Sequence, residues 1–304
     1  MPSITGLVPA VFTPLKNDCS LNLDLVPRIA EHLLQSGVGG LYVCGSTGEG
    51  PLLTLEERRA VATAYIEATA GRVPVMVQVG QESTREVAAL ARHAADIGAT
   101  AISAVPPVYF KPGSVEVLVD TMKEIAGAAP DLPFYYYHIP ALSAVTLDME
   151  QFLELAKDVI PNLAGIKFSS PRLDELQACR NFEGGRFDIL FGVDEMLLCG
   201  LASGAKGAVG STYNFLAPLY NEIIQCYNEK KTEEAETLQA QVAALVRVMI
   251  AHRGLPAIKT CMKLIGLDCG PTRLPLQTLD EKETAALKEG LERLGFFDWA
   301  TLKQ

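Results

Sequence analysis

The amino-acid sequence predicts an α/β fold in which eight parallel strands form a barrel surrounded by helices. Short, continuously apolar segments alternate with longer segments of helical period, as expected for strands that are buried on both faces. A chain of 304 residues with 49% hydrophobic content can bury one large core. Eight such β-α units in series are typical of a TIM (β/α)8 barrel. The alternative is a doubly wound open sheet, which usually has a glycine-rich loop after its first strand, whereas this chain has Thr13-Pro14-Leu15-Lys16 there.

The predicted strands are apolar runs without the polar alternation of a half-exposed sheet. They are Leu7–Phe12, Leu41–Cys44, Val75–Val79, Ala101–Val105, Phe134–Tyr137, Ala164–Lys167, Phe187–Phe191 and Gly207–Val209. Successive strand residues face opposite ways, so Tyr135 and Tyr137 share a face and Tyr136 does not.

The segments between the strands place apolar residues on one face at helical spacing. One predicted helix opens at Thr54, which is a good N-cap and is followed by two acidic residues. The others are Leu23–Leu34, Ser83–Ile97, Val115–Ala128, Asp148–Val159, Leu173–Cys179, Glu195–Ala202 and Pro218–Tyr227.

After Tyr227 the alternation of strands and helices stops. Three further helices are predicted, at Thr232–Ile250, Ala257–Ile265 and Glu281–Leu294, and no low-complexity linker precedes them. The sequence therefore predicts a (β/α)8 barrel over residues 1–228 and a C-terminal helical extension over residues 229–304 that packs on the barrel.

Composition excludes several classes of function. The formal net charge is -10 and there is no basic run, so nucleic acid and anionic membranes are poor partners. The seven cysteines are scattered without a C-x-x-C pair, which suggests neither disulfides nor a zinc site and fits a reducing compartment. The segment Met1–Gly6 lacks a signal-peptide pattern, and no window has the roughly 18 apolar residues of a membrane helix. We therefore expect a soluble, cytoplasmic protein.

Barrels of this kind place their chemistry at the C-terminal ends of the strands, and Lys167 ends one of the predicted strands. An ammonium group at the end of a buried strand is costly unless it has a use. A desolvated lysine loses its proton more readily, and its neutral amine can attack a ketone to form a Schiff base. The alternative is a lysine whose head group reaches solvent from the strand end.

Two other groups at this rim match a Schiff-base site. The loop Gly45-Ser46-Thr47-Gly48-Glu49 follows a strand, and its backbone N–H groups and hydroxyls can hold a carboxylate. Tyr137 also ends a strand, and a phenol near an imine can transfer a proton. The alternatives are an ordinary turn before a capped helix and aromatic core packing.

The remaining polar residues give weaker signals. Asp194 and Glu195 are either a pair that binds a polyol or the acidic first turn of a helix. His138 follows Tyr137 and is expected to face the other way as a structural histidine. The other three histidines, His32, His93 and His252, have no metal-ligand spacing, so no metal site is predicted.

Four motifs, in their order along the chain, match one known family. They are Gly45–Glu49, Tyr137, Gly165–Lys167 and Gly210–Asn214. With them the chain resembles the pyruvate-dependent Schiff-base aldolases, the dihydrodipicolinate synthase/N-acetylneuraminate lyase family, from about residue 6 to about residue 276. Residues 135–142, 190–195 and 273–277 resemble the lyases. Synthases typically carry an arginine where this chain has Leu142, which cannot pair with a second carboxylate.

The resemblance implies a role for each matching residue. The catalytic residues would be Lys167, which forms an imine with the C2 ketone, Tyr137, which takes the proton of the C4 hydroxyl, and Thr47. Ser46 and Thr47 would bind the substrate carboxylate. The contacts with the hydroxyl-rich tail of the substrate would come from Ser169, Gly192, Asp194, Glu195 and Ser211. Tyr109 matches a position at which some relatives carry a tyrosine of an inter-subunit proton relay.

The resemblance also implies an activity and an assembly. The expected reaction is reversible cleavage of N-acetylneuraminate, a sialic acid, to pyruvate and N-acetylmannosamine, with the covalent imine in place of any metal or organic cofactor. The expected assembly is a homotetramer whose other partners are small molecules only. Two alternatives remain: a pyruvate-releasing aldolase for another 2-keto-3-deoxy sugar acid, and a non-catalytic relative that binds keto acids or sialic acid.

Overall fold

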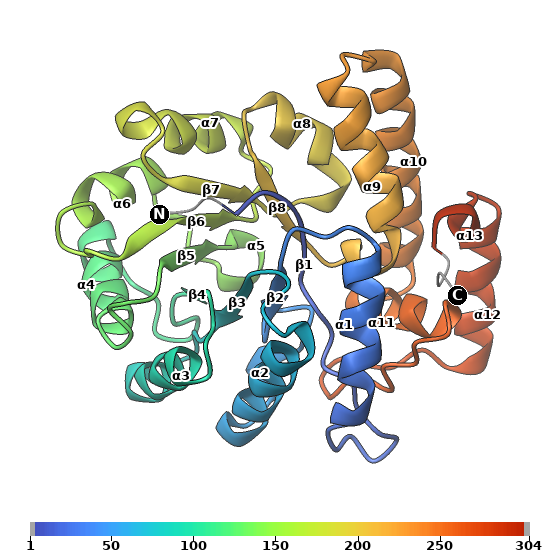
Figure 1. Ribbon diagram of the computed structural model, residues 1–304, viewed down its shortest axis with the longest axis horizontal. Coiled ribbons are helices and arrows are strands. Elements are labelled where there is room, and N and C mark those ends of the chain that lie inside the picture. Colours follow the sequence, from blue (N-terminus) through green and yellow to red (C-terminus); the bar gives the residue numbers. More distant parts are fainter. Residues whose placement is uncertain (1–3, 301–304) are drawn as a thin grey trace.

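Eight parallel strands form the centre of the fold (Figure 1). The computed structural model describes residues 4–300; residues 1–3, which belong to the segment examined above for a signal peptide, and residues 301–304 lie outside the described range. The strands are β1 Gly6–Pro9, β2 Leu41–Val43, β3 Val75–Gln78, β4 Ala101–Ala104, β5 Phe134–His138, β6 Leu163–Phe168, β7 Asp188–Phe191 and β8 Gly207–Gly210. Each lies within a few residues of its predicted position.

The sheet closes on itself. Its order runs β1-β8-β7-β6-β5-β4-β3-β2, and every neighbouring pair is parallel. The two ends meet through a parallel bridge between Ala10 and Tyr42, where the Val11 N–H donates to the Tyr42 carbonyl at 3.0 Å. The predicted (β/α)8 barrel is therefore confirmed.

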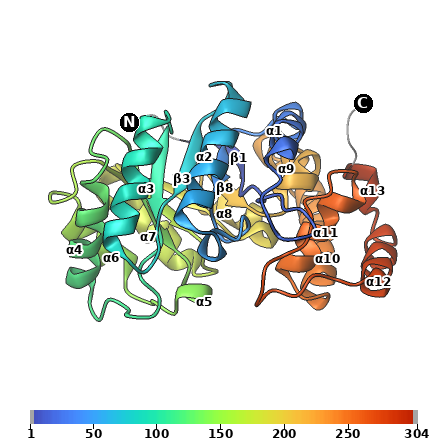
Figure 2. The same ribbon diagram turned by 90° about the horizontal axis from the view of Figure 1, so that it is seen from below.

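Helices surround the barrel and extend beyond it (Figures 1 and 2). The α-helices are α1 Val26–Gln35, α2 Leu55–Thr69, α3 Thr84–Asp96, α4 Val115–Ala126, α5 Pro140–Ser143, α6 Met149–Ala156, α7 Leu173–Asn181, α8 Leu197–Ala202, α9 Tyr213–Asn228, α10 Thr232–Ala251, α11 Leu255–Leu264, α12 Glu281–Glu292 and α13 Phe296–Trp299. Short 3-10 turns lie at Leu23–Leu25, Gly50–Leu52, Phe182–Gly184 and Asp194–Met196. The N-cap predicted at Thr54 is confirmed, and it forms a capping box with Glu57.

Some helix boundaries were predicted wrongly. Helix α9 starts at Tyr213 and not at Pro218, which lies inside it; the backbone is irregular at Leu216, just before the proline. The segment 195–202 enters its helix through the 3-10 turn Asp194–Met196. Helices α5 and α13 were not predicted, because four residues are too few to show a helical period.

The barrel interior and its outer wall are packed by different side chains of the same strands. Tyr135 and Tyr137 lie in the interior together with Tyr42 of β2, which confirms that the two β5 tyrosines share a face. Tyr136 points outward and packs on Phe152 of α6, with ring centroids 4.9 Å apart. Tyr137 lies toward the C-terminal ends of the strands, whereas the Tyr135 hydroxyl donates to Asp188 at the start of β7.

The C-terminal helices lie on one side of the barrel, beside α1 and α9 (Figures 1 and 2). Val242, Leu245 and Met249 of α10 belong to the same buried cluster as Leu219 of α9 and Val11 near β1. The predicted division at residue 228 stays a prediction, since the core is continuous across it. In the described range, no helix is both long and apolar enough to cross a bilayer.

Candidate active site

Lys167 points into the barrel from β6. Its neighbours Ile166 and Phe168 face the outer wall, so strand alternation turns the lysine inward. The side chain is 3% exposed, and Nζ lies 3.8 Å from the ring centroids of both Tyr42 and Tyr137. Burial lowers the pKa of Lys167, and the nearby Tyr137 and Asp194 oppose this decrease only in part. The neutral amine is therefore more accessible here than on an exposed lysine.

Gly165 allows β6 to lie where it does. A Cβ at this position would come within 1.7 Å of the Asp188 carbonyl oxygen on β7. Only a glycine fits so close an approach of two backbones. The Gly-Ile-Lys motif thus has a packing reason for its first residue and a chemical reason for its last.

Tyr137 lies beside Lys167, because the two residues are register partners on β5 and β6. Its phenol oxygen is 3.5 Å from Ser46 Oγ, and its ring meets Tyr42 edge-on with centroids 5.8 Å apart. The phenol therefore lies between the lysine and the glycine-flanked loop, where a proton-transfer group is needed.

The loop that carries Ser46 and Thr47 follows β2. Thr47 Oγ1 is 2.7 Å from Ser211 Oγ, at the end of β8. The Gly50 N–H donates to the Gly45 carbonyl at 3.0 Å, which closes the loop into a tight turn. Two strand ends thus bring three hydroxyl groups together beside the lysine, and hydroxyls are good donors to a carboxylate.

Asp194 is the buried carboxylate of the site. It accepts hydrogen bonds at Oδ2 from Thr212, from the backbone N–H at 2.8 Å and from Oγ1 at 2.7 Å. Burial raises the pKa of Asp194 to about 6, although both hydrogen bonds and the charge of Lys167 act in the opposite direction. Gly210 makes room for the carboxylate, since a Cβ there would meet Oδ1 at 2.0 Å.

These side chains surround a cavity of about 220 Å³. Its lining includes Ser46, Thr47, Tyr137, Lys167, Ser169, Gly192, Asp194 and Ser211, together with Ala10, Ile139, Leu142, Val209, Gly210, Leu255 and Ile258. Eight of the sequence-predicted residues are therefore brought together around one space at the C-terminal ends of the strands.

Two sequence-predicted residues do not line this cavity among the described residues. Glu195 follows Asp194 in a 3-10 turn, which directs successive side chains apart, and its carbonyl accepts a hydrogen bond from Gln239. Tyr109 lies on a loop and is 81% exposed; its N–H donates to Glu82 and its ring packs edge-on against Phe110. Roles for Glu195 and Tyr109 stay predictions.

Sequence reasoning missed several residues of the site, among them Tyr42, Leu255 and Ile258. Tyr42 lies under the Lys167 ammonium, and its inward direction follows from strand alternation once the strand is known. Leu255 and Ile258 come from α11, in the C-terminal region, and form part of the cavity wall. No local pattern shows that a helix so far along the chain reaches the barrel mouth.

Three larger hollows lie elsewhere on the described surface. One, of about 360 Å³, contains His138 and Glu175; a second, of about 400 Å³, contains Arg180 and Lys206; a third, of about 690 Å³, contains Pro27 and His93. Glu175 accepts the N–H of Met149 at the start of α6, and Arg180 lies in the last turn of α7, where a cation stabilises the helix end. Structural roles therefore account for Glu175 and Arg180.

His138 faces the outer wall and has a packing role, as expected. Its ring lies 5.0 Å from that of Phe168, and burial lowers its pKa to about 4, so it is neutral near pH 7. Among residues 4–300, no group of three or more His, Cys, Asp or Glu side chains is arranged to hold a metal ion.

Comparison with known proteins places the chain in a family. The Dihydrodipicolinate synthetase family matches residues 3–294. N-acetylneuraminate lyase of Homo sapiens is 37% identical over 99% of this chain and 95% of its own. Solved N-acetylneuraminate lyases of Aliivibrio salmonicida and Proteus mirabilis are each 41% identical with a TM-score of 0.95, covering 97% of this chain and 98% and 100% of theirs. A dihydrodipicolinate synthase of Bacillus anthracis is 26% identical over 96% of this chain and 99% of its own, with a TM-score of 0.90. The chain therefore belongs to the dihydrodipicolinate synthetase family, with sialic acid aldolases among its similar relatives.

Proposed function

We propose that this chain is an N-acetylneuraminate lyase, a class I aldolase that cleaves N-acetylneuraminate reversibly to pyruvate and N-acetylmannosamine. The observation that carries the proposal is the position of Lys167 Nζ, buried at the base of the cavity beside Tyr137. The similarity of the whole chain to N-acetylneuraminate lyases supports the choice of substrate.

In the proposed reaction, the neutral Nζ of Lys167 attacks C2 of the keto acid. The C2 hydroxyl then takes the proton of the Tyr137 phenol and leaves as water, which gives a protonated imine and a Tyr137 phenolate. The imine takes up the electron pair of the C3–C4 bond as that bond breaks, while the proton of the C4 hydroxyl passes to the phenolate of Tyr137. The enamine that remains takes a proton at C3, and water then releases pyruvate. The imine is the electron sink, so we propose no metal or organic cofactor.

The cavity lining suggests how the substrate is oriented. Ser46 and Thr47 donate hydrogen bonds to the carboxylate, which holds C2 near Lys167. Asp194 and Ser169 lie at the other strand ends and provide acceptors for the hydroxyl tail. Leu142 lines the same cavity and offers no cation for a second carboxylate, which favours a lyase over a synthase.

We also propose a homotetramer that acts in the cytoplasm. Tyr109 and Phe110 are both 81% exposed and form one apolar patch, which fits a contact with a second subunit and a relay through Tyr109. All seven cysteines are free, which fits a reducing compartment. Light scattering of the parent chain and of Tyr109→Ser measures the assembly. If Tyr109→Ser remains a tetramer and its turnover is unchanged, Tyr109 has neither the proposed subunit contact nor the proposed relay role.

The test of the activity is pyruvate release by the purified chain from N-acetylneuraminate and from a 2-keto-3-deoxy sugar acid without the acetamido group. We expect the former to be the better substrate. A preference for the latter would keep the chemistry and change the substrate. Binding without release from either would favour the non-catalytic alternative.

A further inference from the structure

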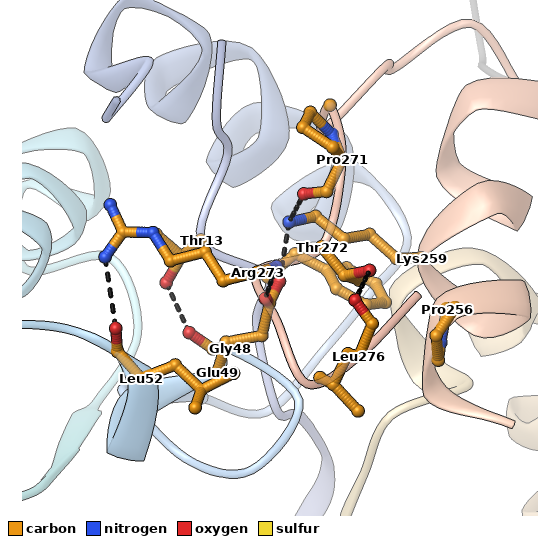
Figure 3. A network of polar contacts seen from close by, with 12 residues as sticks. Thr13, Gly48, Glu49, Leu52, Pro256, Lys259, Pro271, Thr272, Arg273 and Leu276 are labelled. Atoms are coloured by element: carbon orange, nitrogen blue, oxygen red, sulfur yellow. Dashed lines mark hydrogen bonds and ion pairs between the residues drawn. The ribbon is translucent and has the colours of Figure 1, made fainter. Parts of the chain in front are cut away.

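Glu49, the last residue of the glycine-flanked loop, forms a buried ion pair with Lys259 of α11 (Figure 3). The Lys259 Nζ and Glu49 Oε1 atoms are 2.7 Å apart, and the side chains are 2% and 1% exposed. In every other ion pair of the described residues, both partners are at least 18% exposed. The pair joins residues 210 positions apart in the sequence.

The remaining hydrogen bonds of the pair come from one C-terminal segment (Figure 3). The Arg273 N–H donates to Glu49 Oε2 at 2.8 Å, and Lys259 Nζ also donates to the Pro271 carbonyl at 2.7 Å. The Arg273 guanidinium in turn binds Glu57 at the start of α2, at 2.5 and 2.6 Å. Residues from α11 and from 271–273 therefore hold the loop from one side.

The loop is held from the barrel side as well. Thr13, just after β1, donates its hydroxyl to the Gly48 carbonyl at 2.6 Å. Glu49 itself has a left-handed backbone conformation, with φ of 56°, which is uncommon for a residue with a side chain. Such a conformation persists where the surroundings determine it, and here both carboxylate oxygens are fixed.

A buried ion pair is weak evidence for stability, because desolvation offsets much of the attraction between the charges. The Glu49–Lys259 pair is better explained by its geometry, because it fixes the position of the loop relative to α11. Lys259 lies next to Ile258 on α11, and Ile258 and Leu255 line the cavity. The same helix therefore forms part of the wall of the site and is joined to the loop by the ion pair.

We infer that Glu49 and Lys259 are positioning residues, which hold the Ser46–Thr47 loop against α11 in the geometry that binds the substrate carboxylate. The inference rests on the proposed function, since it assigns the carboxylate to this loop. Neither charged group lines the cavity among the described residues, so both act through Ser46 and Thr47. The C-terminal helices are then a working part of the active site.

The test compares Lys259→Met with Lys263→Met. Lys263 lies one turn later on α11 and pairs at the surface with Asp268, so it is a matched control. We expect Lys259→Met to raise the pyruvate Kd and the KM for N-acetylneuraminate by about tenfold to a hundredfold. The kcat should change much less, because the carboxylate is held equally before and during bond cleavage. Hydrogen exchange of the 45–50 amides should become faster, and Lys263→Met should leave all these values unchanged.

A second variant separates positioning from stability. Glu49→Gln/Lys259→Met removes both charges, and the glutamine can still accept the Arg273 N–H. We expect its melting temperature to return toward that of the parent while the pyruvate Kd stays raised, because the loop is no longer joined to α11. If the pyruvate Kd of Glu49→Gln/Lys259→Met returned to the parent value together with the melting temperature, the Glu49–Lys259 pair would have only a structural role.

The outcomes distinguish this inference from the proposed function. A parent chain that binds pyruvate, with Lys259→Met binding it equally well or showing unchanged exchange at 45–50, overturns the inference alone. A parent chain that binds pyruvate but does not cleave N-acetylneuraminate overturns the proposed substrate, and the pyruvate Kd and exchange still decide the inference. A parent chain that does not bind pyruvate overturns both.

Discussion

Two buried lysines in this protein have opposite surroundings. Lys167, in the barrel interior, forms no ion pair within residues 4–300 and lies against two tyrosine rings, whereas Lys259 binds the Glu49 carboxylate and a backbone carbonyl. Burial without a contacting carboxylate lowers the pKa of Lys167 and favours its neutral amine, which is the nucleophile. Burial alone therefore does not make a lysine reactive. The absence of a contacting carboxylate distinguishes Lys167 from Lys259.

The largest expected effect comes from removing the reactive lysine. Lys167→Ala should reduce pyruvate release to background, a loss greater than the roughly 10⁴-fold upper range for a proton-transfer group. Lys259→Met should retain imine formation at saturating pyruvate. A coupled pyruvate assay measures both variants, and comparable losses in the two would break the distinction between these lysines.

Tyr137→Phe should have the next largest effect. Without the phenol there is no nearby group to take the C4 hydroxyl proton, so kcat should fall by about 10²- to 10⁴-fold. The amine of Lys167 remains, so borohydride should still trap the pyruvate imine. Single-turnover kinetics with trapping separates the two steps, and a variant that loses the imine as well would make Tyr137 necessary for imine formation.

Asp194 extends the comparison to carboxylates, since Glu49 has a contacting cation and Asp194 does not. Burial raises its native pKa from the ordinary 3.8 to about 6. Between these values the folded chain holds a proton that the unfolded chain has released, so the free energy of unfolding decreases as pH rises through this window. The shift corresponds to about 3 kcal/mol.

Asp194→Asn cannot titrate and should lose this part of the pH dependence. Urea unfolding of parent and variant at several pH values from about 4 to about 7 measures the difference. The free energy of unfolding of the parent minus that of Asp194→Asn should fall by a few kcal/mol as the pH rises from about 4 to about 6. If the difference in free energy of unfolding did not change with pH, the native pKa of Asp194 would be near its ordinary value.

Metal removal should have the smallest effect. The imine is the electron sink of the proposed reaction, so incubation with EDTA followed by a pyruvate-release assay should leave the rate unchanged. A loss of activity that added divalent cations restore would give the reaction an electrophile other than the imine.

Local patterns predicted most of the fold. Continuously apolar runs gave eight strands because both faces of a barrel strand are buried, and Thr54 gave a helix start because its hydroxyl can satisfy a free N–H. The start of α9 was wrong because Pro218 looks like a first-turn residue and the tertiary packing overrides that preference.

The site was predictable where a residue ends a strand, as with Lys167 and Tyr137. It was not predictable where a partner comes from far along the chain. Lys259 lies on an amphipathic helix and has the local pattern of an exposed lysine, and only the packing of α11 brings it to Glu49. Glu195 was paired with Asp194 because the two are adjacent; it does not line the cavity with Asp194, and its role stays a prediction.

The central claim is that Lys167, and not another lysine, is the nucleophile. The most direct test is borohydride reduction of the purified parent chain with pyruvate, followed by mass analysis of its peptides. The account predicts one reduced adduct, on the peptide that contains Lys167, with none on the peptide that contains Lys259. An adduct on a different lysine, or none under conditions in which the chain binds pyruvate, would contradict it.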